Sequence, residues 1–184
     1  IYYSISKKQD SILQFSHSTS FFSKSSNLQP TLKPIYKAMK TQIDKTKELQ
    51  ANVVLLNEKL HFSGIVEGNE PVSIDYIPPL GDGLGYTSLE LLLLSYSSCL
   101  GSALLTFLRK MKKTIRSFEI DTKGIRRDEH PTAFKTIQVE IRISSPNVSE
   151  EEIERLLSLS EETYCPVWAM IKGNVEIQVR TFIS

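Results

Sequence analysis

The sequence predicts an α+β fold, in which an antiparallel sheet packs on one long central helix. Three short runs of β-type composition precede a long apolar helical stretch, and two long segments of alternating hydrophobicity follow it. Strands that come in groups, separated by single helices, are typical of α+β proteins with antiparallel pairing. The predicted order is β-β-β-α-β-β-α-β, with strands at residues 51–56, 59–66, 72–77, 115–126, 134–144 and 175–183.

The first three strands are expected to form an antiparallel meander. The polar pair at 57–58 and the Gly- and Pro-containing segment 68–71 are turn signals between them. Residues 78–85 are rich in Pro and Gly and predict a loop that neither a helix nor a sheet would tolerate. The segment 128–131 then joins the two long strands as a hairpin.

The long helix, predicted over residues 89–108, has signals at both of its ends. Thr87, followed three residues later by Glu90, forms a capping-box signature, and the cations at 109–113 suit a helix C-terminus. Ser149 and Glu152 form a second capping box that opens the second helix. The apolar positions of the long helix recur at spacings of three and four: Leu89, Leu92, Leu93, Tyr96, Leu100, Ala103, Leu104, Phe107 and Leu108.

Composition and charge exclude several classes of protein. A hydrophobic content of 40%, a charged content of 23% and a net charge of +1 suit a globular domain and give no reason to expect nucleic acid or an anionic membrane as partner. The stretch 89–108 is interrupted by serines and a threonine, so we interpret it as a buried core helix rather than a membrane span. Two cysteines do not make a disulfide scaffold, and no signal peptide is visible, so a cytoplasmic location is expected.

Residues 1–38 differ in character from the rest of the chain. They are Ser-rich, contain Asp10 as their one acidic residue, and show no sustained hydrophobic period. Two interpretations stay open: an appended or upstream-translated extension, which we favour, and the remnant of a targeting peptide. Under both, this segment is expected to be poorly ordered and to lie outside a single functional domain at residues 39–184.

Two cysteines are the candidate site residues. Cys99 lies inside the apolar helix, and Cys165 directly precedes Pro166, a residue well suited to the first position of a short helix. Cys165 would then lie at or beside the N-cap, where the helix dipole and free amides stabilise a thiolate. Two thiols can reduce a peroxide, because one becomes a sulfenic acid and the other condenses with it to a disulfide. Cys99 alone also fits a small core residue.

Other candidate groups have simpler explanations. Glu90 lies nine residues before Cys99, which places the two side chains on roughly opposite faces of a straight helix, so the capping box explains it better. Three dispersed histidines, in the extension (His17), in a strand (His61) and in a turn (His130), have no visible partner. Two Cys and three His without a recognised ligand spacing disfavour a metal site.

Four motifs together make the chain resemble the OsmC/Ohr family of thiol proteins over about residues 50–184. They are the loop Gly81-Asp82-Gly83, the run 90–93 with Cys99 nine residues after Glu90, the segment 128–131 followed by Phe134, and the segment 162–167 around Cys165. The resemblance implies an OsmC-like α+β fold and an intertwined homodimer, with the long helices at its centre and active sites at the subunit interface. It also implies Cys99 as the peroxidatic and Cys165 as the resolving cysteine.

The chain departs from the peroxidase members of that family in two respects. Those members carry a Glu ten residues before the first cysteine, where this chain has Leu89, and an Arg in the N-terminal strands, whereas residues 1–108 here contain no Arg. The chain thus resembles a subgroup whose activity is less well established. Arg126 or Arg127 is the candidate source of a cation from the later hairpin.

These observations lead to two functional hypotheses. The first is a cytoplasmic thiol-dependent peroxidase that reduces organic hydroperoxides through Cys99 and Cys165, is recycled by a dithiol reductant, and needs no metal or organic cofactor. The alternative is an OsmC-fold protein that binds a small apolar ligand or senses redox state without significant peroxidase activity. A cation near Cys99 separates the two. Because Leu91, Leu94 and Leu105 lie outside the main apolar stripe, we also expect a homodimer that covers the long helix.

Overall fold

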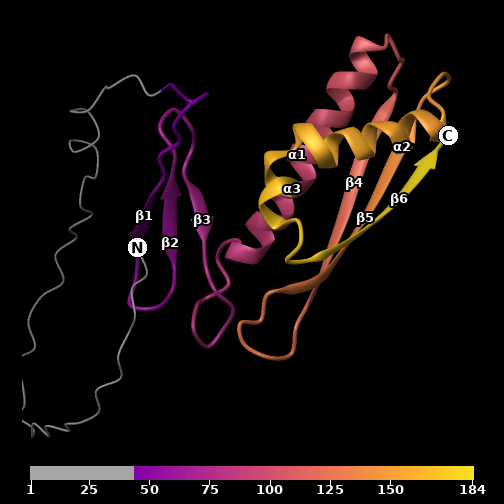
Figure 1. The fold of residues 1–184 in the computed structure, drawn as a ribbon. Helices are drawn as coiled ribbons and strands as arrows, with labels where there is room; N and C mark the ends of the chain where they lie inside the picture. Colours follow the sequence, from indigo (N-terminus) through magenta and orange to yellow (C-terminus); the bar gives the residue numbers. More distant parts are fainter. Residues whose placement is uncertain (1–43) are drawn as a thin grey trace, which may run out of the picture. The chain divides into compact units, whose positions relative to one another are not determined.

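The computed structural model describes residues 44–184, so the extension predicted at 1–38 lies outside the described residues. The helices and strands of these residues belong to the unit from Glu48 to Ser184, and their content confirms the α+β prediction (Figure 1). The elements are β1 (Asn52–Leu55), β2 (Phe62–Ile65), β3 (Val72–Ile74), α1 (Ser88–Lys110), β4 (Ser117–Arg126), β5 (Phe134–Ser144), α2 (Glu150–Leu159), the π-helical segment η2 (Ser160–Tyr164), α3 (Pro166–Ile171) and β6 (Glu176–Ile183).

Strands β1, β2 and β3 form the predicted antiparallel meander. The register pairs Val53 with Gly64 and Phe62 with Ile74. Each strand is shorter than its sequence pattern indicates, and β3 ends at Ile74. The chain leaves β3 at this point because the next residue, Asp75, turns its side chain to the backbone of the following loop.

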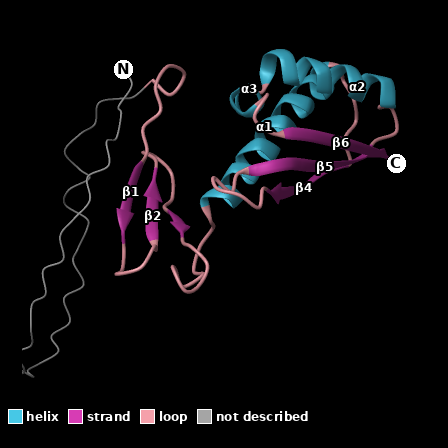
Figure 2. Ribbon diagram, turned by 60° about the horizontal axis from the view of Figure 1, so that its bottom comes forward, coloured by secondary structure: helices cyan, strands magenta, loops and turns pink. Residues whose placement is uncertain are grey.

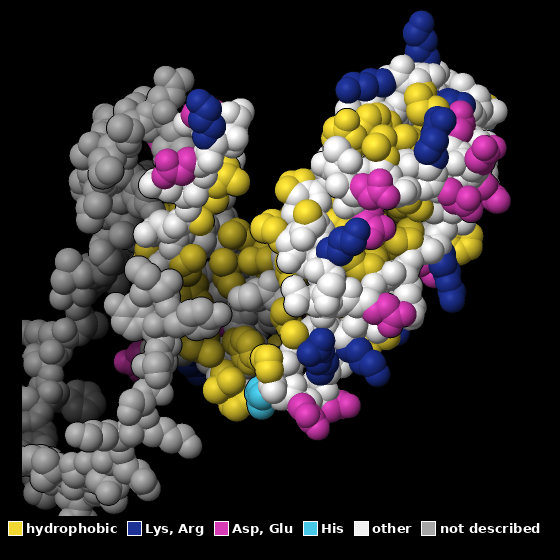
Figure 3. Space-filling model, viewed as in Figure 1, with side chains coloured by type: hydrophobic (Ala, Val, Ile, Leu, Met, Phe, Trp, Pro, Cys, Tyr) yellow, Lys and Arg dark blue, Asp and Glu magenta, His cyan; other side chains and the backbone are white. Residues whose placement is uncertain are grey.

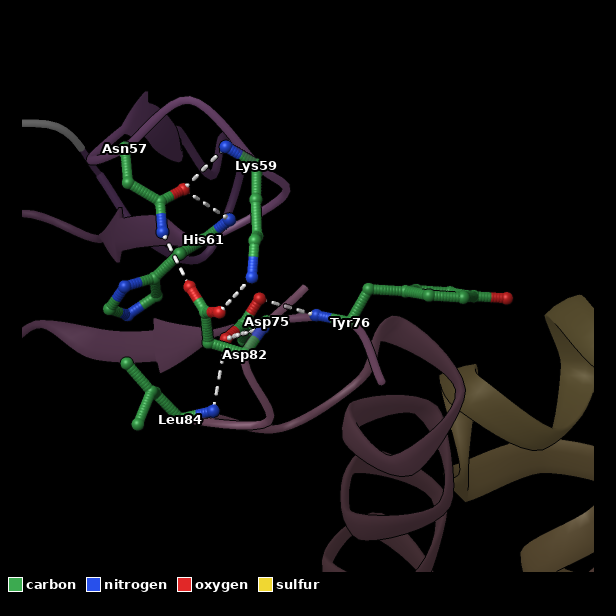
Figure 4. A network of polar contacts seen from close by, with 7 residues as sticks. All are labelled: Asn57, Lys59, His61, Asp75, Tyr76, Asp82 and Leu84. Atoms are coloured by element: carbon green, nitrogen blue, oxygen red, sulfur yellow. Dashed lines mark hydrogen bonds and ion pairs between the residues drawn. The ribbon is translucent and has the colours of Figure 1, made fainter. Parts of the chain in front are cut away.

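The Asp75 carboxylate organises the Gly-rich loop after β3. This side chain is 2% exposed, and it accepts hydrogen bonds from the backbone N–H groups of Tyr76 (2.7 Å), Asp82 (3.1 Å) and Leu84 (2.9 Å) (Figure 4). The Asp82 side chain forms an ion pair with Lys59 and accepts a 3.0 Å hydrogen bond from Asn57. These contacts attach the loop to the segment between β1 and β2.

A glycine is required at position 81 in the middle of this loop. A Cβ atom on Gly81 would lie 2.0 Å from the carbonyl oxygen of Tyr76 and 2.3 Å from Oδ1 of Asp75. Gly83 has a φ of +70°, a backbone conformation that residues other than glycine rarely adopt. The Gly-Asp-Gly motif therefore allows the loop backbone to approach the carboxylate of Asp75 closely enough to donate hydrogen bonds to it.

The second sheet has the order β4-β5-β6, and one of its two pairings differs from the prediction. Strands β4 and β5 are antiparallel, with Ile120 opposite Ile141, but β6 runs parallel to β5, with Val139 beside Val179. The expectation of antiparallel pairing throughout was wrong for β6. A parallel pair needs a crossover of a dozen or more residues, and α2, η2 and α3 supply it.

The hydrophobic core lies between this sheet and the helices that cover one of its faces (Figure 2). Both predicted capping boxes are present, Thr87 with Glu90 on α1 and Ser149 with Glu152 on α2. The fully buried side chains come mainly from the inner stripe of α1 and from β5: Tyr96, Leu100, Leu104, Leu108, Ile137, Val139, Ile141 and Ile143.

Helix α1 is long and apolar enough, by length and composition alone, to cross a membrane. One face of the helix, however, packs on the sheet. Within the described residues, 33% of its most apolar 18-residue stretch is buried. Core helices of globular domains combine the same length and composition. On its other side Leu94 is 51% exposed. The described part of this chain therefore covers only one face of α1.

Replacing Asp75 by Asn is expected to lower the unfolding midpoint by several degrees and to speed amide exchange at Asp82 and Leu84. Burial alone would raise the pKa of Asp75, but the N–H groups of Leu84, Tyr76 and Asp82 outweigh it and hold the pKa below its usual value. The stabilisation is therefore complete above the unfolded pKa of about 3.9 and is lost as the pH falls through the lower folded value.

The control for this prediction is Asp82→Asn, which removes an exposed ion pair that contributes little to stability. Thermal melts between neutral pH and acid, with hydrogen exchange on both variants, make the comparison. Equal midpoints for Asp75→Asn and the wild type would contradict the role assigned to the carboxylate.

Candidate functional site

The two cysteines lie together at the junction of α1 and α3. Their sulfur atoms are 2.7 Å apart, although the residues are 66 positions apart in sequence, and both are free thiols. A disulfide bond is about 2.05 Å long. A small displacement of either side chain would therefore suffice to join Cys99 to Cys165.

Helix α1 places Cys99 at the border of its buried stripe. Tyr96 and Leu100, which flank Cys99 on the inner side, are fully buried, whereas Ser98 is exposed. Cys99 itself is partly buried. It is therefore the thiol of the pair that solvent and small solutes reach more easily.

An irregular helical turn places Cys165. In η2 the backbone N–H of Cys165 donates to the carbonyl of Ser160 at 2.9 Å, five residues back, and the Ser160 hydroxyl donates to the carbonyl of Leu156 at 2.7 Å. Turns of this wide type are rare and occur frequently at functional sites. The turn ends the helical run that begins with α2. After it, the chain places Cys165 beside Cys99 of α1.

Cys165 is the N-cap of α3, as the sequence predicts. Pro166 opens the helix, and the Cys165 sulfur accepts a hydrogen bond from the backbone N–H of Trp168 at 3.4 Å. The N-cap position was expected to stabilise the thiolate form of Cys165, but other effects on its pKa are larger. Burial to 2% exposure raises the pKa of the Cys165 thiol, the hydrogen bond with Cys99 raises it further, and the Trp168 N–H lowers it only in part.

The pair is therefore asymmetric. Cys165 is a protonated thiol at neutral pH, and its S–H group donates to the sulfur of Cys99. Since the thiolate is the nucleophilic form of cysteine, Cys165 is a poor initial nucleophile. The arrangement favours first attack by the more accessible Cys99, with Cys165 as its proton-bearing neighbour.

Among residues 44–184, neither sulfur accepts a hydrogen bond from a lysine or an arginine. The two arginines that the sequence offered as a source of charge are held elsewhere. Arg126 bonds to Thr132 in the loop between β4 and β5, and Arg127 donates to the carbonyl of Asn174 at 3.2 Å. The cation that would separate the two functional hypotheses is thus not supplied by this hairpin.

The remaining ionisable candidates have structural partners. Glu90 accepts from the backbone N–H of Thr87 at 2.6 Å and from its hydroxyl at 2.9 Å, and these bonds lower its pKa, so the capping interpretation is confirmed. His61 lies just before β2 rather than in a strand, and its ring is 2.9 Å from the hydroxyl of Ser73. His130 is in the loop between β4 and β5, and His17 lies outside the described residues.

Two aromatic residues beside the thiols were not identified as site residues from the sequence. Tyr96 lies three residues before Cys99, and its ring packs edge-on against Trp168 with the centroids 5.7 Å apart. Tyr96 matched the apolar stripe of the helix, so the sequence pattern assigned it to the core and gave its hydroxyl group no role. Its spacing from Cys99 was the one available signal, because residues three apart share a helix face.

We expect an alkylating reagent at neutral pH to modify Cys99 well before Cys165. The reason is that Cys165 is both buried and protonated, and its labelling should rise only in alkaline solution. Peptide mapping after timed exposure to iodoacetamide measures the two rates, and unfolded protein, in which both thiols react, is the control. Faster modification of Cys165 in the folded protein would contradict this asymmetry.

Comparison with known proteins places the chain in a family. The family model described as OsmC-like protein matches residues 81–180, more than half of the chain. Protein YhfA of Escherichia coli strain K12 is 25% identical over 89 residues, which span 48% of this chain and 66% of that protein.

Solved structures are similar over most of their length. A hypothetical protein from Aquifex aeolicus VF5 has a TM-score of 0.65 at 26% identity, covering 74% of this chain and 96% of that one. The organic hydroperoxide resistance protein OhrB of Bacillus subtilis shares the fold, with a TM-score of 0.52 at 17% identity and coverage of 73% and 98%. The chain therefore belongs to the OsmC/Ohr family of OsmC-like proteins.

Proposed function

We propose that this protein is a thiol-dependent peroxidase that reduces organic hydroperoxides through Cys99 and Cys165. The observation that carries the proposal is the 2.7 Å separation of the two sulfur atoms, one accessible and one buried. A structural thiol in the core has no need of a second thiol at this distance. A peroxidatic and a resolving cysteine must meet to form a disulfide.

The reaction runs in three balanced steps. The Cys99 thiolate attacks one peroxide oxygen, the O–O bond breaks, and the departing alkoxide takes up a proton and leaves as the alcohol. The Cys165 sulfur then attacks the sulfenic sulfur on Cys99, an S–S bond forms, and the S–OH oxygen leaves as water with the proton of Cys165. A dithiol reductant finally exchanges with the disulfide, which restores both thiols and leaves the reductant oxidised.

Family relatives lend support to the substrate class. OhrB of Bacillus subtilis is named an organic hydroperoxide resistance protein, and so is an OsmC protein of Legionella pneumophila with a TM-score of 0.55. At 17% and 18% identity the structural likeness itself shows a shared fold alone, so the substrate class is taken from their names and is part of the proposal. We propose a cytoplasmic setting, since a reducing compartment keeps dithiol reductants available.

A second function, binding of a small apolar ligand, is favoured by different observations. The β1–β3 meander has a hollow of about 270 Å³, lined mainly by apolar residues such as Val53, Ile65, Val72 and Ile74, with Asn52, Asn69 and Glu70 also in its lining. The described residues also give the sulfur pair no cation, which a fast peroxidase thiol would be expected to use. Under this alternative, the protein binds its ligand tightly and reacts with hydroperoxides no faster than free cysteine does.

The substitution Cys99→Ser should abolish consumption of an organic hydroperoxide. Cys165→Ser should spare the first turnover and trap a sulfenic acid on Cys99, because the attacking sulfur carries the oxygen and the resolving sulfur only condenses with it. Mass spectrometry of the treated proteins measures both outcomes, with hydrogen peroxide as a comparison substrate. The peroxidase proposal fails if the wild type forms no Cys99–Cys165 disulfide and both thiols react as slowly as free cysteine.

We further propose that the protein is a homodimer that covers the exposed side of α1. Hydrophobic side chains are exposed on the β1–β3 meander and over the helical layer in the view of Figure 3. They include Val53 (56% exposed), Leu55 (53%), Leu84 (63%) and Leu94 (51%). Apolar area of this extent on a small domain is typical of an association surface.

Sedimentation at micromolar concentration should therefore give twice the mass of the chain. The substitution Leu94→Glu, which puts a charge on the exposed side of α1, should shift the protein towards the monomer without changing its far-ultraviolet circular dichroism. Arg155→Glu on an exposed position of α2 is the control and should sediment as the wild type does. A monomeric wild type would overturn the dimer proposal.

A further inference from the structure

The hydroxyl group of Tyr96 is buried and has no hydrogen-bond partner among the described residues when both cysteines are free thiols. The residue as a whole is 0% exposed. Nearly all buried polar side-chain atoms in folded proteins have a partner, and an orphaned one costs stability. Phenylalanine at this position would fill the same space without that cost, so the hydroxyl calls for a role.

The position of Tyr96 ties it to the sulfur pair from two sides. On α1 it precedes Cys99 by three residues and shares its side of the helix. Its ring packs on Trp168 of α3, whose backbone N–H is bonded to the Cys165 sulfur. Tyr96, Cys165 and Trp168 all belong to the buried hydrophobic core of the domain.

The ionisable groups around the hydroxyl also favour its role as a hydrogen-bond donor. Burial raises the pKa of Tyr96, and the negative charge that Cys165, Glu161 and Cys99 carry once they are ionised raises it further. Of these groups, Glu161 is paired with Lys172 at 2.9 Å. The phenol therefore keeps its proton throughout the physiological range and is within electrostatic reach of both thiols as a donor.

The resolving step creates a need for such a donor. To attack Cys99, the Cys165 sulfur must lose its proton while it is nine-tenths or more buried, and the N–H of Trp168 offsets only part of that cost. In the described part of the chain, no lysine or arginine donates to this sulfur. A neutral hydroxyl in the same buried core can stabilise the forming thiolate without adding a second charge.

We propose that the Tyr96 hydroxyl donates a hydrogen bond to the Cys165 sulfur as that thiol loses its proton and attacks Cys99. The inference rests on the proposed function only in taking Cys165 as the resolving thiol. In the dithiol form the Cys165 sulfur donates to Cys99 and accepts from the N–H of Trp168, and the Tyr96 hydroxyl is not bonded to it, so the proposed bond requires the two side chains to move closer together. The bond forms when negative charge develops on Cys165, so Tyr96 acts in the second step and not in the first.

A thiol-exchange reaction tests this step without any peroxide. Dithionitrobenzoate, added to the full-length protein, reacts first with Cys99 to give a mixed disulfide and one thionitrobenzoate. The Cys165 sulfur then attacks the Cys99 sulfur, the Cys99–Cys165 bond forms, and the second thionitrobenzoate leaves. Stopped-flow absorbance resolves the two releases and follows each of them as a function of pH.

For Tyr96→Phe we expect the first release to be unchanged and the second to be about tenfold slower, the order of effect of one hydrogen bond to a charged group. The pH profile of the second release should move to higher pH, since the thiolate has lost a donor. The melting temperature should stay the same or rise, because an unpaired hydroxyl has been removed. A merely structural role would lower the melting temperature and leave the pH profile in place.

The matched control is Tyr164→Phe, which removes an exposed hydroxyl next to Cys165 in sequence and keeps the packing of the ring on Phe107. It should release both thionitrobenzoates as the wild type does. The inference is overturned if Tyr96→Phe releases the second thionitrobenzoate at the wild-type rate at every pH, or if the wild type releases no second one. Normal exchange in a wild type that consumes no hydroperoxide would sink the peroxidase proposal and leave this inference standing.

Discussion

The packing of α1 on the β4-β5-β6 sheet is the constraint on which the rest of the structure depends. Tyr96, Leu100, Leu104 and Leu108 follow one another at intervals of four along the helix and are fully buried. They share one buried core with the inward side chains of β5, and Ser97 on the same helix contacts Thr122 of β4, so the packing fixes the rotation of the helix about its axis. That setting places Cys99 at the border of the buried stripe, accessible in part and yet beside the core.

The crossover between β5 and β6 supplies the second half of the site. Because β6 pairs parallel to β5, the chain must traverse the helical face of the sheet, and it does so through α2, η2 and α3. The wide turn at Ser160–Tyr164 brings the chain back over α1 with Cys165 at the start of a new helix. The same topological requirement that makes the sheet mixed therefore brings the two thiols together.

The site is a compromise between burial and reactivity. Burial keeps Cys165 protonated, and in the proposed mechanism this protects Cys165 from direct oxidation and leaves Cys99 to react first. Burial would also make the second step of that mechanism costly, because a buried sulfur must become an anion where the described residues offer no positive charge. Neutral donors, the N–H of Trp168 and, on our proposal, the hydroxyl of Tyr96, are the means available in this chain to reduce that cost.

Local signals in the sequence were sufficient for most of the elements and for the identity of the two thiols. The capping boxes at Thr87 and Ser149, the Pro166 that opens α3 and the alternation in β4 and β5 each depend on residues within one turn or one strand, so the sequence determined them by itself. Burial, partner choice and strand direction depend on residues far apart in sequence. Only the tertiary structure therefore decided that β6 is parallel to β5, that Cys165 meets Cys99, that Arg126 and Arg127 are engaged elsewhere, and that burial outweighs the helix N-terminus at Cys165.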